Sequence, residues 1–213
     1  MNQPTADKLH YIRIPKAQGG RAEMVRLVYV LSGRPYVDVL CAIDQASQSK
    51  VVKNPFQQFP VVETQDGRFL YQTLAIMHHA AHGTPAWPSD PSRLTDALAV
   101  AMGGYDLYQA FGGFPADDLA AKKKFEEKRA PQLITGLGEI YASRPFAAGE
   151  VATFADCVVE EAVGWCTRRN EVCRRLFEGN GALMAFHARF DAIPAIRAFR
   201  ARQAAARQSD ESV

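Results

Sequence analysis

The sequence predicts a small α/β domain followed by an all-helical domain. Strand-like and helical patterns alternate as far as residue 82. Residues 83–91 then carry three prolines and one glycine, a composition that is typical of a linker. After residue 92 only helical periodicity is visible. We therefore expect two domains, over residues 1–83 and 92–213.

The first half of the chain begins with a strand, a helix and a second strand. Residues 8–14 predict a strand that Pro15 ends. Residues 21–31 predict a helix, whose apolar residues cover most of its circumference, as in a helix buried on two sides. Gly33 and Pro35 stop this helix, and residues 36–40 predict the second strand. Residues 44–56 are polar and irregular, with room for one short helix.

Residues 59–76 predict a hairpin that leads into a helix. Asp66-Gly67 separates two apolar runs, which predicts a two-residue turn with positive φ at its central residues. Pro60 opens the first strand, where it costs no ladder hydrogen bond. Thr73 stands at the helix start, where a hydroxyl can cap free N–H groups and the N-terminus favours an anion. This element order is that of a thioredoxin-like domain with a mixed sheet.

The second half of the chain predicts helices only. Thr153 and Asp156 have the spacing of a capping box, which we interpret as structural. The tail from Gln203 onward is polar, and we expect it to be frayed. The predicted helices cover residues 92–111, 117–142, 154–168, 170–177, 181–190 and 194–205.

Bulk composition is that of a soluble globular protein. The net charge of +2 is too small to indicate nucleic-acid binding, and no apolar run approaches the ~20 residues of a membrane span. The N-terminus lacks the apolar core of a signal peptide. The four cysteines show no C-x-x-C pair and the five histidines no metal motif, so we expect free thiols, no metal and a cytoplasmic location.

Four segments resemble the cytosolic glutathione transferases, in the correct order over nearly the whole chain. Residues 20–26 are similar to the first-helix start of the sigma-type, tyrosine-using branch. Residues 59–73, 149–156 and 190–199 resemble the hairpin with its Gln-Ser pair, the start of the central helix and the final helix of that family. The resemblance implies a glutathione transferase fold, a homodimer, and glutathione as co-substrate.

The resemblance also assigns glutathione contacts around the hairpin. Pro60 matches the family's cis-proline, while Gln72 and Thr73 match the pair that holds the γ-glutamyl group. The other implied contacts are the Phe59 backbone with the cysteinyl moiety, Lys50 or Lys53 with the glycyl carboxylate, and Gln58 beside it. Ser47 falls where sigma-type members often carry a tryptophan, so that contact is missing.

Tyr11 is the candidate that activates the glutathione thiol. A hydroxyl that donates to sulfur stabilises the thiolate. In the family this tyrosine usually stands closer to the arginine of the first helix, whereas Tyr11 and Arg21 are ten residues apart. Either residues 12–18 contain an insertion, or the strand runs on to Ile14 and Pro15 or Lys16 sits near the sulfur.

The electrophilic substrate is expected between the domains, against aromatic residues with helical spacing: Tyr105, Tyr108 and Phe111. The aspartate that many members send across their dimer interface has no counterpart, because Ala101 takes its place and Asp106 replaces it only if the register shifts. No cysteine starts the first helix, which argues against the disulfide-reducing branches.

The sequence favours an enzyme that conjugates glutathione to a small hydrophobic electrophile, or isomerises one. Two alternatives stay open. One is a non-catalytic binding or interaction protein with this fold, and the other is a glutathione-dependent peroxidase or isomerase of narrow specificity.

Overall fold

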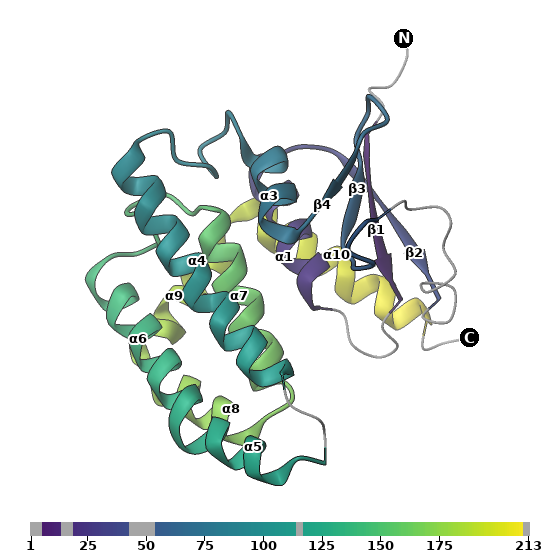
Figure 1. The fold of residues 1–213 in the computed structure, drawn as a ribbon. Helices are drawn as coiled ribbons and strands as arrows, with labels where there is room; N and C mark the ends of the chain where they lie inside the picture. Colours follow the sequence, from purple (N-terminus) through teal and green to yellow (C-terminus); the bar gives the residue numbers. More distant parts are fainter. Residues whose placement is uncertain (1–5, 14–18, 43–53, 114–116, 211–213) are drawn as a thin grey trace.

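A computed structural model describes residues 6–13, 19–42, 54–113 and 117–210 of the chain. It contains a four-stranded sheet with helices α1 and α3 against it, followed by a bundle of helices (Figure 1). The predicted fold class, a thioredoxin-like N-terminal domain and an all-α C-terminal domain, is confirmed. The change from one to the other falls between the end of α3 at Ala81 and the start of α4 at Pro91. The limits of 83 and 92 for independent domains stay a prediction.

The sheet has the strand order β2-β1-β3-β4 and is mixed in direction. Strands β1 (Asp7–Ile12) and β2 (Tyr36–Cys41) are parallel because helix α1 (Arg21–Ser32) crosses between them. Strands β3 (Val61–Glu63) and β4 (Phe69–Tyr71) form the hairpin, and β3 pairs antiparallel with β1. Central pairing places Leu9 beside Asp38 on one side and Val62 on the other.

Two local predictions in this domain were wrong. Strand β1 ends at Ile12 and does not reach Ile14. The hairpin turn is longer than two residues, since Thr64 and Arg68 close a three-residue loop. Only Gly67 has positive φ (79°) there, and the Gly67 N–H bonds the Thr64 carbonyl, as in a type I turn followed by a left-handed glycine.

Helix α1 is buried continuously from Ala22 to Tyr29. It contacts α3 (Thr73–Ala81) within its own domain, and α7 (Phe154–Thr167) and α10 (Pro194–Asp210) of the helical domain. Figure 1 shows α10 running alongside α1. The expectation that this helix is covered on two sides is therefore confirmed, and its second cover is the other domain.

The helical domain follows the predicted order with two differences. The predicted helix over 117–142 is a continuous helical stretch with a π-helical turn, η1 (Phe125–Arg129), between α5 and α6. The tail is helical as far as Asp210, because Gln203 donates 2.9 Å to the Glu23 carboxylate of α1 and ties it down. The remaining bounds are α4 Pro91–Gly112, α5 Leu119–Lys124, α6 Ala130–Ser143, α8 Glu171–Glu178 and α9 Gly181–Ala192.

Helix α7 lies at the centre of the helical domain and starts with the predicted capping box. Asp156 is completely buried and accepts hydrogen bonds from the Thr153 N–H and hydroxyl, the Ala147 N–H and the Tyr141 hydroxyl, at 2.7–3.1 Å. Burial raises the pKa of Asp156 to about 6, and these donors oppose that shift. One carboxylate thus joins the helix start to α6 and to the loop before α7.

Among the described residues, no helix combines the length and the apolar character that crossing a membrane requires.

We predict that Asp156→Ala lowers the free energy of unfolding by at least about 3 kcal/mol, because it leaves four buried donors without this acceptor. Thr153→Ala should cost roughly 0.5–2 kcal/mol, since only one side of the box is lost. Thr153→Ser keeps the hydroxyl and serves as the control. Urea titration followed by circular dichroism measures all three, and a loss below about 1 kcal/mol for Asp156→Ala would contradict this assignment.

Candidate glutathione site

A pocket of about 220 Å³, counted with its opening to solvent, lies between the hairpin and the starts of α1 and α3. It is built from three separate segments of the chain. Its lining consists of Arg21, Asn54, Phe56, Gln58, Phe59, Pro60, Tyr71, Gln72 and Thr73. The structure therefore brings together five of the residues predicted around the hairpin.

The segment before β3 contributes to the lining of this pocket. The Phe59–Pro60 peptide bond is cis, as the resemblance implied. Strand β3 begins at Val61, so Phe59 lies beyond the last paired residue of the sheet. Asn54 holds the preceding turn, because its side chain accepts from the Phe56 N–H at 2.9 Å and donates to the Gln58 carbonyl.

Gln72 is the N-cap residue of α3 and has the positive φ of 66°. Such a backbone conformation is uncommon for a residue with a side chain and is found often at functional sites. Thr73 is the first residue inside the helix, and no side chain caps this N-terminus. The expected capping role of Thr73 is thus wrong, and the first N–H groups of α3 lie at the pocket wall without a side-chain acceptor.

Tyr11 lies near the end of β1 and is 7% exposed. Its hydroxyl reaches Gly20, the residue that precedes the first residue of α1. It also lies 2.9 Å from the position that a Cβ on Gly20 would occupy. Burial raises the pKa of Tyr11, and the charges of Arg21 and Arg26 oppose that shift. The phenol therefore stays protonated at neutral pH.

The ten-residue spacing between Tyr11 and Arg21 does not keep them apart. Strand β1 ends at Ile12 and helix α1 begins at Arg21, directly after Gly20. Residues 14–18, including the alternative candidates Pro15 and Lys16, lie outside the described residues. Lys50, Lys53 and Ser47 also lie outside them, so their predicted contacts stay predictions.

The three aromatic residues of α4 do not share one environment. Tyr105 lies beside Thr73, and burial raises the pKa of Tyr105 to about 12. The Tyr108 hydroxyl is 3.4 Å from the Cβ position of Gly20, and its ring is 5.5 Å from that of Trp165. Phe111 instead packs on Phe125 of the helical domain, with ring centroids 5.7 Å apart. The two tyrosines thus lie at the domain boundary.

Sequence reasoning missed Arg21 as a pocket residue. Arg21 is the first residue of α1, and its guanidinium donates 3.2 Å to Gln109 of α4. Its place directly after Gly20 at a helix start was the signal that could have found it. At the position of the absent aspartate, Ala101 is completely buried, and Asp106 forms an ion pair with Arg129 at 2.9 Å.

Comparison with known proteins agrees with this architecture. Residues 105–203 match the family described as glutathione S-transferase, C-terminal domain. No curated protein sequence gives a significant match. The fold is similar to those of the Pi-class glutathione S-transferase of Onchocerca volvulus and of rat hPGDS.

The Onchocerca volvulus alignment has a TM-score of 0.80 and 21% identity, and covers 95% of this chain and 96% of that one. Rat hPGDS, solved with a quinoline, aligns at 0.79 and 22%, over 93% and 97%. The prostaglandin synthase D of Nilaparvata lugens aligns at 0.78 and 17%, over 92% and 96%. At these identities the likeness establishes the glutathione transferase fold.

We predict that Gly20→Ala destabilises the protein by roughly 1–3 kcal/mol, because Gly20 has φ of 83° and the new methyl group meets the Tyr11 hydroxyl. The double variant Gly20→Ala/Tyr11→Phe should regain part of this loss, since the clashing oxygen is gone. A double-mutant cycle by chemical unfolding measures the coupling. Purely additive effects would show that the two residues are not in contact.

Proposed function

We propose that this protein is a glutathione transferase-like enzyme that joins glutathione to a small hydrophobic electrophile. One observation carries the proposal: Phe59, cis-Pro60, Gln72 and Thr73 line a single pocket on a glutathione transferase fold. The match of residues 105–203 to the family's C-terminal domain supports it.

The pocket suits a peptide that carries an anionic end. The Thr73 hydroxyl and the first N–H groups of α3 can donate to a carboxylate, which the helix dipole also favours. Arg21 adds a positive charge to the same wall. The backbone of Phe59, beyond the last sheet pair, is available to bond a peptide group of the ligand. These are the contacts that the γ-glutamyl and cysteinyl parts of glutathione require.

Tyr11 would activate the thiol. A free thiol of this kind has a pKa near ~8.5, so little thiolate forms at neutral pH. The Tyr11 phenol keeps its proton because burial raises its pKa, and it can therefore donate to the sulfur anion. The thiol proton leaves to solvent, the thiolate forms a carbon–sulfur bond with the electrophile, and the displaced group departs with its electron pair.

Tyr105 and Tyr108 lie at the boundary where an electrophile would meet the sulfur. Their rings indicate a small hydrophobic substrate. The similarity to a structure named as a prostaglandin synthase D makes glutathione-dependent isomerisation the second reaction to assay. We also infer a homodimer in the cytoplasm, which light scattering and cell fractionation would test.

A non-catalytic binding protein is the second candidate. It is favoured by the buried Ala101 and by the pairing of Asp106 with Arg129, which together leave no aspartate on this part of α4 for a partner's glutathione. Activity towards a generic aryl halide separates the two candidates, since both would bind glutathione and only the enzyme would turn it over.

We predict that the protein binds glutathione and that Gln72→Ala weakens binding by roughly 1–3 kcal/mol, because a hydrogen bond to a charged group is lost. Titration calorimetry measures both affinities. Gln65→Ala, on the exposed hairpin turn outside the pocket, is the matched control and should bind like the wild type. Absence of binding at millimolar glutathione would refute the proposal.

We predict that Tyr11→Phe keeps glutathione affinity and raises the pKa of the bound thiol. A charge-assisted hydrogen bond is worth roughly 1.5–3 kcal/mol, which corresponds to about one to two pKa units. The ultraviolet absorbance of the thiolate, titrated against pH, measures the shift. Tyr36→Phe removes the hydroxyl of a half-buried tyrosine on β2 and is the control. Identical curves for Tyr11→Phe and wild type would exclude Tyr11 from thiol activation.

A further inference from the structure

We propose that Glu161 of helix α7 is a positioning residue that holds the start of α1 against the Tyr11 hydroxyl. The role of Glu161 in catalysis rests on the proposed function, whereas its contact with Gly20 does not. Glu161 belongs to the helical domain, whereas Tyr11 and the start of α1 belong to the thioredoxin-like domain. A residue of the helical domain thus helps to set the geometry of the proposed thiol site in the other domain.

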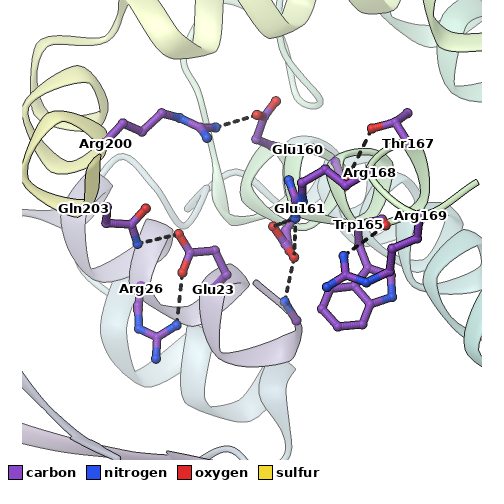
Figure 2. Close-up of polar contacts among 12 residues, drawn as sticks. Glu23, Arg26, Glu160, Glu161, Trp165, Thr167, Arg168, Arg169, Arg200 and Gln203 are labelled. Carbon is purple, nitrogen blue, oxygen red and sulfur yellow. Dashed lines mark hydrogen bonds and ion pairs between the residues drawn. The ribbon is translucent and has the colours of Figure 1, made fainter. Parts of the chain in front are cut away.

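The contact is short, buried and between domains. The Gly20 N–H donates to Glu161 Oε1 at 2.6 Å, and Glu161 is 4% exposed. On the other side of the carboxylate, Arg168 forms an ion pair at 3.1 Å (Figure 2). A buried carboxylate is costly unless it is paired and hydrogen-bonded. Arg168 supplies the opposite charge and Gly20 supplies a hydrogen bond, and together they stabilise the Glu161 carboxylate in this position.

Two adjacent glycines make this approach feasible. Gly19 has φ of 133°, and a Cβ there would lie 2.6 Å from Glu161 Oε1. A Cβ on Gly20 would lie 2.9 Å from the Tyr11 hydroxyl. The Gly19-Gly20 segment is thus packed between the carboxylate on one side and the phenol on the other. Side chains at either position would force one of these two groups away.

The link from Glu161 to Tyr11 passes through one residue, Gly20. Glu161 holds the Gly20 N–H at 2.6 Å, and the Cα of the same residue packs against the Tyr11 hydroxyl, where an added Cβ would lie 2.9 Å from the phenol oxygen. Loss of the Glu161 contact would let the Gly20 peptide rotate and would change how the start of α1 packs against the phenol.

The neighbouring residue Glu160 provides a natural comparison. It too is a buried carboxylate on α7, but its partners are His187 of α9 at 2.9 Å and Arg200 of α10. Figure 2 shows that Glu160 reaches Arg200, whereas Glu161 lies beside Arg168. Glu160 therefore stabilises the helical domain without touching the start of α1, which separates a positioning effect from general stability.

The Glu23–Gln203 contact between α1 and α10 is a second comparison. It also joins the two domains, at 2.9 Å, but Glu23 lies three residues into α1 and also pairs with Arg26. Gln203→Ala would therefore weaken the domain contact without reaching the Gly20 peptide. Glu161 differs from Gln203 because it bonds Gly20 itself, the residue that packs against the Tyr11 hydroxyl.

The first experiment needs no glutathione. Amide hydrogen exchange at Gly20, followed by NMR, should become at least about tenfold faster in Glu161→Ala, because one strong hydrogen bond is lost. Glu161→Gln keeps an acceptor oxygen and should retain most of the protection. Glu160→Ala and Gln203→Ala should leave Gly20 exchange at the wild-type rate once global stability is matched. Equal Gly20 exchange in Glu161→Ala and wild type would overturn the proposal.

The second experiment reads out the site in the glutathione-bound protein. The pKa of the bound thiol should rise in Glu161→Ala and return towards the wild-type value in Glu161→Gln. Glu160→Ala should leave it unchanged even though the protein is less stable. If wild-type protein binds glutathione with a lowered thiol pKa and Glu161→Ala gives the same curve, the positioning role is refuted and the proposed function stands.

If wild-type protein does not bind glutathione, the proposed function fails, while the Gly20 exchange rates still decide whether Glu161 holds the loop. Should Glu161→Ala not fold, Glu161→Leu takes its place, because it fills the same space without an acceptor. A faster Gly20 exchange in that variant supports the proposal, and an unchanged rate overturns it.

Discussion

Helix α1 is shared by the two domains, and the candidate site depends on how its first turn is held. From Ala22 to Tyr29 the helix is buried between the sheet and the helices α7 and α10. Burial of a helix on two sides fixes its axis, but its N-terminus still has free N–H groups that need partners. Here the Glu161 carboxylate accepts from the Gly20 N–H, and the Tyr11 hydroxyl packs against the same glycine. Those two contacts place the start of α1 beside the pocket.

The rigidity of α7 supports this arrangement. Its capping box and the four hydrogen bonds to Asp156 anchor the helix start to α6 and the preceding loop. A helix fixed in this way can present two adjacent buried carboxylates in different directions. Glu160 binds α9 and α10, and Glu161 binds the other domain. The helical domain is therefore more than a cover for the sheet, because it contributes to the geometry at the end of β1.

Much of the fold could be predicted because its signals are local. Periodicity located α1, the hairpin strands and the helices, and the capping box of Thr153 needed only four residues of sequence. Where the prediction failed, a contact from elsewhere in the chain or a local detail was decisive. The polar tail is helical because Gln203 meets Glu23 far away in sequence. Thr73 does not cap α3, because Gln72 adopts a positive φ and becomes the N-cap residue itself.

By itself the sequence determined the element order, because hairpins, caps and helix faces are set by neighbours along the chain. Its resemblance to the glutathione transferases implied five of the residues that line the pocket. Only the tertiary structure decided that Tyr11 reaches the start of α1 across a ten-residue spacing, that Arg21 joins the pocket and that Phe111 packs on Phe125. It also placed Glu161 against Gly20, 141 residues away in the chain. Such juxtapositions depend on how two domains pack, and no local pattern in either segment records that packing.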